Sequence, residues 1–500
     1  MSTFVLMELC KQSGVKNVIY QLLAPSITLN LDEVEENRSY AVIIDKGIRY
    51  CLTGNSGIYD EEASYVLLTD RTPTKQKLID NEIKQRKWIK HPNQIEASPD
   101  DVINSWENRF HFKLEKNEAH PGLRRPQLGA LHALLSHMLS PTETATVVLP
   151  TGTGKTETMM SALVAGRCNR VLVTVPTNAL RGQLFNKFKT LGILKKAKFE
   201  IVDKEALYPI VGVITSAFEG EDQLKSFIRQ CNVVITTMQI IDHAPEEQQD
   251  VYVSSFSNVF VDEAHHIVAT SWRKFSDRFP RHQLVQFTAT PFRNDGQRLD
   301  GKIIFNYPLR QAQKDGYYRT IHFLPVREYG EEAIADKAIA EKAVEKLKDD
   351  QKRYQHIMMA RCETKSRAQA VYKIYKELCP ELRIVLLYSG CPDYIENYNK
   401  VLKRDVDIVV CVNMLGEGFD LPELKIAAFH DIRKSLPITL QFSGRFTRTS
   451  RDAELGDASF VANIADLTVK QELDSLYEED ADWNILLADV NDNKVTDEKE

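Results

Sequence analysis

The spacing of apolar residues changes near residue 123. Beyond that point, short apolar runs of strand length alternate with longer amphipathic segments, in two successive sets. Such alternation predicts parallel strands joined by helices that cover the sheet. Two α/β domains in tandem, with a cleft between them, are the simplest arrangement, and a connector around 307–330 separates them. The predicted strands are 146–150, 171–176, 233–237, 259–262 and 285–290 in the first set and 355–360, 383–389, 407–412 and 426–431 in the second.

The first 110 residues follow a different pattern. Residues 39–50 have apolar-rich arms on either side of Asp45-Lys46-Gly47, which predicts a β-hairpin. Residues 64–68 form another strand candidate, and the charged segment 75–90 reads as a helix. We therefore expect a small α+β domain before the two α/β domains. The predicted domains are 1–115, 121–310 and 325–470, followed by an acidic tail at 471–500 or the start of a further region.

Composition is that of an ordinary globular protein, with 43% hydrophobic and 27% charged residues in 500. This length is enough for several hydrophobic cores. No apolar run reaches the roughly 18 residues of a membrane span, and the first residues lack a basic leader. Eight scattered cysteines without a C-x-x-C pair indicate reduced thiols. We expect a cytoplasmic protein without a membrane partner.

The net charge of −6 is unevenly distributed along the chain. Residues 452–500 contain fifteen acidic residues against three lysines, a local charge of −12. Residues 1–451 therefore carry +6. A mildly basic body permits a nucleic-acid backbone as ligand but does not require one.

A phosphate-binding loop is predicted directly after the first strand of the first set. The segment PTGTGKT at 150–156 joins a strand to a helix, where backbone N–H groups and the helix dipole attract an anion. Glycines allow close backbone approach, lysine supplies a positive charge, and the Thr156 hydroxyl can bind Mg²⁺. Leu149 stands where the full pattern has glycine. The predicted ATP-binding residues here are Thr151, Gly152, Thr153, Gly154, Lys155 and Thr156.

An acidic pair ends the strand at 259–262. Asp262 can hold Mg²⁺, and Glu263 can position and deprotonate an attacking water. A solvated acidic turn before a helix is the alternative for this pair alone. Its separation of 107 residues from Lys155 suits several intervening βα units.

The segment QFSGRFTR at 441–448 is the third piece. Gln441, Arg445 and Arg448 fall on one helical face. The two arginines could reach a γ-phosphate and neutralise the charge that develops during phosphoryl transfer. A basic helix face on the surface is the alternative.

Together, the phosphate loop, DEAHH at 262–266 and the arginine segment resemble a superfamily 2 helicase of the DExH type, from about residue 121 to about 470. LRRPQ at 123–127, TAT at 288–290 and GEGFD at 416–420 occur in the expected order. The resemblance is to the branch of restriction-enzyme motor subunits and related bacterial DNA helicases. It implies two RecA-like domains that bind ATP and Mg²⁺ between them, hydrolyse ATP and bind nucleic acid.

The resemblance also implies roles for residues outside the three pieces. Gln127 would read the adenine edge, and Asp420 would face the nucleotide. Residues that couple hydrolysis to movement would be His265, Thr288, Thr290 and Gly418. Contacts to nucleic-acid phosphates, which position the ligand without reading bases, would come from Thr177, Arg181, Thr237, Thr364 and Lys365. For Arg181 and Lys365 a solvated helix face is the alternative.

Two functions of different classes fit these motifs. The first is an ATP-dependent helicase or translocase, acting on DNA rather than RNA, as the motor of a bacterial anti-phage defence system. The second is an ATP-driven sensor or clamp that gates a partner nuclease or effector without processive unwinding. An inactive scaffold is disfavoured because Lys155, Asp262, Glu263 and Arg448 are all present.

Overall fold

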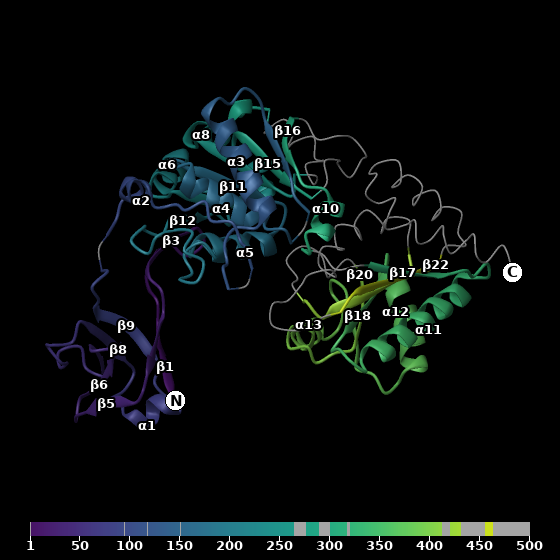
Figure 1. Ribbon diagram of the computed structural model, residues 1–500, viewed down its shortest axis with the longest axis horizontal. Coiled ribbons are helices and arrows are strands. Elements are labelled where there is room, and N and C mark those ends of the chain that lie inside the picture. Colours follow the sequence, from purple (N-terminus) through teal and green to yellow (C-terminus); the bar gives the residue numbers. More distant parts are fainter. Residues whose placement is uncertain are drawn as a thin grey trace. The chain divides into compact units, whose positions relative to one another are not determined.

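The computed structural model describes residues 2–94, 96–117, 119–150, 152–264, 277–289, 301–317, 321–412, 421–431 and 456–463 (Figure 1). The chain forms two compact units. The first contains Met1–Ala145, Thr156–Gln286 and Arg293–Ile304, and the second contains Thr146–Lys155, Phe287–Phe292 and Phe305–Glu500. Among the described residues, no helix combines the length and the apolar character that crossing a bilayer requires.

The N-terminal residues contribute two small sheets of their own. β1 (Thr3–Leu6) pairs antiparallel with β4 (Ile27–Asn30). A five-stranded sheet follows, in the order β5-β6-β7-β8-β9. The predicted hairpin is confirmed as β6 and β7, and Lys46 and Gly47 in its turn have positive φ values of 52° and 77°, as a two-residue turn of type I′ requires. The strands are β5 (Glu33–Glu36), β6 (Tyr40–Asp45), β7 (Ile48–Thr53), β8 (Tyr65–Thr69) and β9 (Gln85–Lys90).

The helix predicted at 75–90 is wrong in its second half. α1 covers only Lys75–Ile79, and Asn81 then adopts a left-handed φ of 54°. The remainder forms β9, which pairs antiparallel with β8 and buries Trp88. Pairing with a neighbouring strand thus overrides the helix-like charge pattern, because local propensity is weaker than tertiary packing.

A nine-stranded sheet contains the strands of the first predicted set, in the order β16-β10-β15-β14-β11-β13-β12-β3-β2. β14, β11, β13 and β12 are parallel, and β3 continues the sheet antiparallel to β12. All predicted strands of the first set are present. Strands not predicted are β2, β3, β12 and β16. The strands are β16 (Lys302–Asn306), β10 (Ala145–Val148), β15 (Leu284–Thr288), β14 (Asn258–Asp262), β11 (Val171–Val175), β13 (Val233–Thr237), β12 (Ile210–Val213), β3 (Val18–Ala24) and β2 (Leu9–Ser13).

β11 and β13 are buried along their whole length. Helices cover parallel sheets on both faces, which is why their inner strands are continuous apolar runs. The residues of β2 and β3 precede the five-stranded sheet in the chain yet belong to this one. The domain boundary at 115 stays a prediction. The connecting helices are α2 (Pro99–Ser105), α3 (Arg125–Leu139), α4 (Lys155–Ala165), α5 (Asn178–Phe188), α6 (Glu221–Arg229), α7 (Met238–Asp242) and α8 (Glu246–Ser255).

The second sheet has six parallel strands in the order β17-β22-β21-β18-β20-β19. The predicted strands of the second set are confirmed, and β22 was not predicted. α11 and α12 pack on one face, as Figure 1 also shows, and α13 packs on the other. The elements are α10 (Leu309–Lys314), β17 (Ile321–Val326), α11 (Glu332–Asp350), β18 (Ile357–Cys362), α12 (Lys365–Leu378), β19 (Ile384–Leu387), α13 (Tyr394–Leu402), β20 (Ile408–Val412), β21 (Leu424–Phe429) and β22 (Ala458–Asn463).

Candidate nucleotide and nucleic-acid sites

The loop after β10 is wound tightly before α4 begins. The backbone N–H of Thr153 donates to the Pro150 carbonyl at 3.2 Å, and its hydroxyl donates to the same oxygen at 2.7 Å. Gly152 and Gly154 have φ values of 88° and 104°, which side chains other than glycine rarely adopt. α4 then begins at Lys155. The loop therefore has the backbone that a phosphate cradle needs.

Leu149 explains why the loop departs from the full phosphate-loop pattern. Its side chain is fully buried, and its N–H donates to the Thr288 carbonyl at 2.9 Å. The backbone just after β10 is thus still hydrogen-bonded to the end of β15 at this position, where the pattern would have glycine. Thr288, predicted as a coupling residue, is itself fully buried.

Lys155 is 8% exposed and is the first residue of α4. A cation at a helix N-terminus lies at the positive end of the helix dipole, so an anion bound there interacts favourably with both. Glu157, two residues further along α4, forms an ion pair with Lys187 of α5, and 2.8 Å separates Glu157 Oε1 from Lys187 Nζ. Burial works against ionisation of the Glu157 carboxyl, but the Lys187 ammonium lowers its pKa. This ion pair joins the first turn of α4 to α5.

Gln127 has a defined structural contact at the start of α3. Its side-chain oxygen accepts the Arg124 N–H at 2.7 Å, which caps the helix. The side chain is 3% exposed. The cap holds the side-chain amide of Gln127 in one orientation. The contact of Gln127 with adenine stays a prediction.

Asp262 and Glu263 end β14 in a strained turn. Asp262 is buried, and its Oδ1 accepts the Glu263 N–H at 3.1 Å. Glu263 is half-buried and has a left-handed φ of 49°, which costs a non-glycine residue about 1–2 kcal/mol. Such strain concentrates at functional positions. The fully buried Ala264 fixes the chain beyond the turn.

The first-unit residues predicted to contact phosphates share one edge of the sheet. Thr177 follows β11 and Thr237 ends β13, and Val175 and Thr237 are partners in the parallel pairing. The Thr177 hydroxyl accepts the Leu180 N–H at 3.3 Å and so caps α5. Arg181 donates to the Ile214 carbonyl at 3.3 Å, and burial lowers its pKa. Arg181 is therefore more than a solvated residue of a helix face.

The second-unit candidates lie at the start of α12. Thr364 is exposed, and its hydroxyl accepts the Arg367 N–H at 3.3 Å as the helix cap. Lys365 is exposed, and its ammonium lies 5.6 Å from the centre of the Tyr388 ring. Both side chains are accessible to a ligand.

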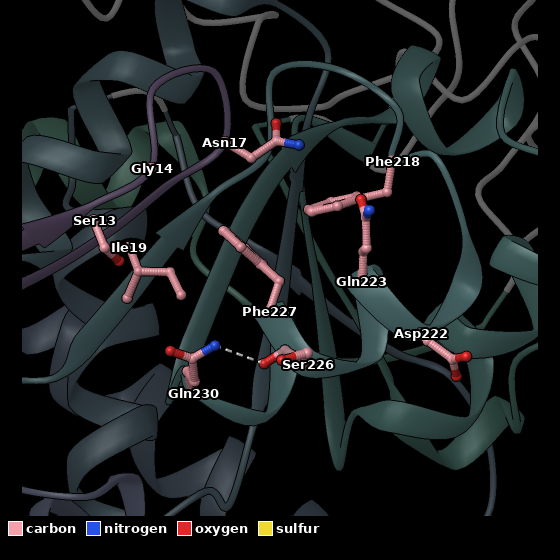
Figure 2. Close-up of a pocket in the computed structure, with 10 residues that line it drawn as sticks. All are labelled: Ser13, Gly14, Asn17, Ile19, Phe218, Asp222, Gln223, Ser226, Phe227 and Gln230. Atoms are coloured by element: carbon pink, nitrogen blue, oxygen red, sulfur yellow. Dashed lines mark hydrogen bonds between the residues drawn. The ribbon is translucent and has the colours of Figure 1, made fainter.

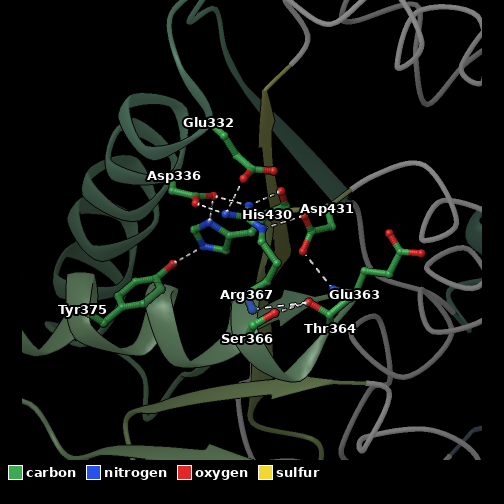
Figure 3. A network of polar contacts seen from close by, with 9 residues as sticks. All are labelled: Glu332, Asp336, Glu363, Thr364, Ser366, Arg367, Tyr375, His430 and Asp431. Carbon is green, nitrogen blue, oxygen red and sulfur yellow. Dashed lines mark hydrogen bonds and ion pairs between the residues drawn. The ribbon is translucent and has the colours of Figure 1, made fainter.

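A buried ionic network behind this helix start was not predicted from the sequence (Figure 3). Arg367 donates two parallel hydrogen bonds to Asp336, at 2.6 and 2.9 Å. Its Nε also donates to Asp431 at 3.0 Å. Asp336 is 2% exposed, so the bidentate pair compensates a carboxylate removed from water.

His430 extends the network in Figure 3. Its Nδ1 lies 2.9 Å from Asp336 Oδ1, and its Nε2 lies 3.1 Å from the Tyr375 hydroxyl. Burial works against ionisation of Asp336, but hydrogen bonds from His430 and Arg367 keep its pKa below the ordinary value. Asp431 accepts the Glu363 N–H at 2.8 Å. The network thus ties α11, the turn before α12 and the end of β21 together. The polar pair His430-Asp431 after an apolar strand was the available signal.

Eight predicted residues lie outside the described part of the chain: Thr151, His265, Thr290, Gly418, Asp420, Gln441, Arg445 and Arg448. Their roles stay predictions. The described residues contain no cluster of three or more His, Cys, Asp or Glu side chains that could hold a metal ion.

Part of the chain matches a known protein family. Residues 120–293 match the family described as the type III restriction enzyme, res subunit. Over 362 residues the chain is 24% identical to the ATP-dependent RNA helicase DRS1 of Eremothecium gossypii, a match that covers 66% of this chain and 46% of the relative. The chain thus spans about half the length of this curated relative.

Two solved structures share the fold at low sequence identity. A fragment of a putative HsdR subunit of a type I restriction enzyme from Vibrio vulnificus YJ016 is 15% identical, with a TM-score of 0.52, covering 94% of this chain and 88% of that one. The ATP-dependent type ISP restriction-modification enzyme LlaBIII bound to DNA is 16% identical, with a TM-score of 0.51, covering 87% and 35%. The predicted fold, α/β with two tandem RecA-like parallel sheets, is confirmed.

Proposed function

We propose that this chain, which belongs to the superfamily 2 helicases, couples ATP hydrolysis to movement on DNA. The observation that carries the proposal is the loop at 150–156, with left-handed Gly152 and Gly154 and a buried Lys155 at the start of α4. Helix-start N–H groups and the lysine charge converge there, which suits a triphosphate.

The residues that would hold ATP and Mg²⁺ have the right chemistry. Thr156 and Asp262 offer hydroxyl and carboxylate oxygens, the donors that Mg²⁺ prefers. When bound, Mg²⁺ would neutralise part of the charge on the transferring phosphoryl group. Gln127 would contact adenine, and Asp420 would face the nucleotide. The phosphates would be held by Thr151, Gly152, Thr153, Gly154 and Lys155.

Glu263 is the proposed general base. Its carboxylate would orient the attacking water and accept its proton, and the strained turn would fix that carboxylate beside Asp262. Gln441, Arg445 and Arg448 would neutralise charge on the phosphoryl group from the second domain. The proposed coupling residues are His265, Thr288, Thr290 and Gly418.

The proposed ligand is the backbone of single-stranded or duplex DNA. Thr177, Arg181 and Thr237 at one sheet edge, with Thr364 and Lys365 at the start of α12, are suited to phosphate contacts without base readout. DNA is preferred over RNA because the matched family and the two solved structures described above are named as restriction enzymes. The RNA helicase among the relatives makes RNA the ligand to test against DNA.

The proposal extends to biological context. A role in anti-phage defence, with a nuclease or effector partner, rests on the restriction-enzyme relatives. A cytoplasmic location rests on cysteine usage: all eight cysteines are free thiols, and seven of them are buried.

The central test measures ATP turnover with single-stranded DNA, duplex DNA and RNA in parallel at fixed salt. We expect DNA to stimulate turnover most. Glu263→Gln should keep binding of a fluorescent ATP analogue while turnover falls by about 100-fold or more, within the range for a lost general base. Unstimulated turnover with every nucleic acid, or normal turnover of Glu263→Gln, would contradict the proposal.

A strand-displacement assay separates the two functional classes. Displacement of a labelled strand that depends on ATP indicates a helicase. DNA-stimulated hydrolysis without displacement or translocation indicates the clamp or sensor that gates a partner.

A further inference from the structure

The turn of the β2–β3 hairpin lies at the same sheet edge as the predicted phosphate contacts. β3 runs antiparallel to β12, and Val18 pairs with Val213, near the carboxyl end of β12. β12 is parallel to β13, which ends at Thr237, and β13 is parallel to β11. Carboxyl ends of parallel strands share one edge, so residues 14–17 of the hairpin turn extend that edge beyond β12.

The hairpin turn is fixed by side-chain hydrogen bonds to the loop after β12. Asn17 Oδ1 accepts the N–H groups of Thr215 and Ser216 at 2.8 and 3.1 Å. Asn17 Nδ2 donates to the Ser216 carbonyl at 3.1 Å, and the Thr215 hydroxyl donates to the Lys16 carbonyl at 2.7 Å. Four hydrogen bonds thus hold the hairpin turn to a loop that lies 198 or 199 residues further along the chain.

Gly14 makes this turn possible. Its φ is 85°, and a Cβ atom at this position would lie 2.0 Å from the Asn17 carbonyl oxygen. Any other residue would force the turn open. The turn is therefore pre-organised, which lowers the conformational cost of binding.

The same loop is held from its other side by a predicted phosphate-contact residue. Arg181 donates to the Ile214 carbonyl, and the Thr236 hydroxyl donates to that carbonyl at 3.2 Å. Residues 214–216 therefore connect the hairpin turn to Arg181 and to the end of β13. The hairpin turn and Arg181 are thus held by the same loop.

The turn presents its side chains to solvent. Val15 is 96% exposed, and Lys16 is exposed and makes no ion pair with any described residue. Beside the turn lies a pocket of about 500 Å³, which Figure 2 shows between the hairpin and α6. Asp222 lines this pocket, so its carboxylate repels a phosphate. An anionic strand would accordingly pass over Lys16 rather than through the pocket.

We propose that residues 14–17 are a nucleic-acid-binding element in addition to the superfamily motifs. In this element Lys16 contacts a backbone phosphate, and Asn17 positions Lys16. This inference rests on the proposed function. An ammonium group is a suitable partner for a backbone phosphate, because such a contact does not depend on the base sequence.

The chain contains a matched control. Lys46 is likewise an exposed lysine in a hairpin turn, but its turn has two residues and its hairpin belongs to the five-stranded sheet of residues 33–90. Lys16→Glu and Lys46→Glu change the net charge equally, so a difference between them reports position and not overall charge.

The experiment measures binding of fluorescein-labelled single-stranded DNA to the full chain by anisotropy, at several salt concentrations. We expect Lys16→Glu to weaken binding about tenfold, as for loss of one charge-assisted contact. The plot of the logarithm of the association constant against the logarithm of salt concentration should become less steep, by about 0.7 in slope. Lys46→Glu should bind DNA as the unchanged chain does, and its basal ATP turnover should be unchanged.

Equal affinities of Lys16→Glu and Lys46→Glu would overturn this inference while leaving the proposed function intact. A chain that binds no nucleic acid at all would instead refute the proposed function. The two failures are therefore distinguishable.

A double-mutant cycle tests the positioning role of Asn17. Asn17→Ala should weaken DNA binding about threefold, but should have almost no effect when Lys16 is already Gln, because coupled residues are non-additive. The same loss in both backgrounds would show that Asn17 does not act through Lys16.

Discussion

The nine-stranded and six-stranded sheets are each covered by a helix that begins with a lysine after a short polar turn. In the first sheet the sequence is Thr153-Gly154-Lys155-Thr156, and in the second it is Glu363-Thr364-Lys365-Ser366. The patterns look alike, yet Lys155 is buried and Lys365 is exposed. The residue before each lysine accounts for the difference in the helix start.

Gly154 has no side chain with which to cap α4, and its left-handed backbone keeps the loop close to the helix start. Thr364 instead uses its hydroxyl to accept the Arg367 N–H of α12. The start of α4 is built to receive an external anion. The start of α12 uses the Thr364 hydroxyl to accept one of its own N–H groups. Similar spacing of polar residues therefore need not mean a similar site.

The largest expected contrast concerns the two lysines. Lys155→Ala should reduce ATP turnover by at least about 100-fold, because it removes a charge that stabilises the transferring phosphoryl group. Lys365→Ala should leave turnover without nucleic acid unchanged and weaken only nucleic-acid binding. Steady-state ATPase assays with circular dichroism as the folding control measure both. Near-normal turnover in Lys155→Ala would remove the basis of the comparison.

Arg367 of α12 and Arg181 of α5 should differ in their effect on stability. Arg367→Ala leaves Asp336 buried without its bidentate partner, which should cost about 3–5 kcal/mol. Arg181→Ala removes one hydrogen bond to a carbonyl and should cost about 1–2 kcal/mol.

Hydrogen exchange of peptides from β18 and β21, compared with peptides from β11 and β13, reports each sheet separately. Equal loss of protection in the two variants would mean that the Arg367 network does not stabilise the second sheet more than Arg181 stabilises the first.

Acid should reveal one paired carboxylate in α4 and another in α11. The pKa values of Glu157 and Asp336 are both below their ordinary values. Their stabilising contribution is therefore present above the unfolded pKa values, about 4.3 for Glu and 3.9 for Asp, and is lost as pH falls through the folded values.

Glu157→Gln and Asp336→Asn should each reduce the loss of stability between neutral pH and acid, measured by urea unfolding at both pH values. Asp336→Asn should have the larger effect, because Asp336 has two hydrogen-bonding partners. An unchanged pH dependence in both variants would contradict this expectation.

The smallest expected effect concerns the two capping threonines. Thr177→Ala and Thr364→Ala should each destabilise the adjacent helix by about 1 kcal/mol, and Ser at either position should restore most of it. Hydrogen exchange at the first turns of α5 and α12 measures the change. If Ser does not rescue either helix, the capping hydroxyl is not the cause.

Much of the fold follows from local pattern. The apolar runs at 171–176 and 233–237 are strands because a fully buried parallel strand needs a continuous apolar sequence. The hairpin at 39–50 follows from its Lys46-Gly47 turn. Of the candidate site, Gly152 and Gly154 have the left-handed backbone that a phosphate loop needs.

Other features could not be predicted from the sequence, because they depend on partners far away in the chain. Residues 85–90 became a strand by pairing with β8, and residues 9–24 joined the nine-stranded sheet by pairing with β12. Arg367 meets Asp336 and Asp431, which lie 31 and 64 residues away. No local pattern around Arg367 distinguishes it from a solvated helix residue.

The sequence by itself determined the parallel strands at the centre of each sheet and the glycine-dependent loop, because each is encoded by residues that are neighbours in the chain. Only the tertiary structure decided which sheet the first hairpin extends, how the loop after β12 is held, and which arginine pairs with the buried Asp336. Those outcomes depend on strand pairing and desolvation between distant segments, where the free energy comes from packing that no local stretch contains.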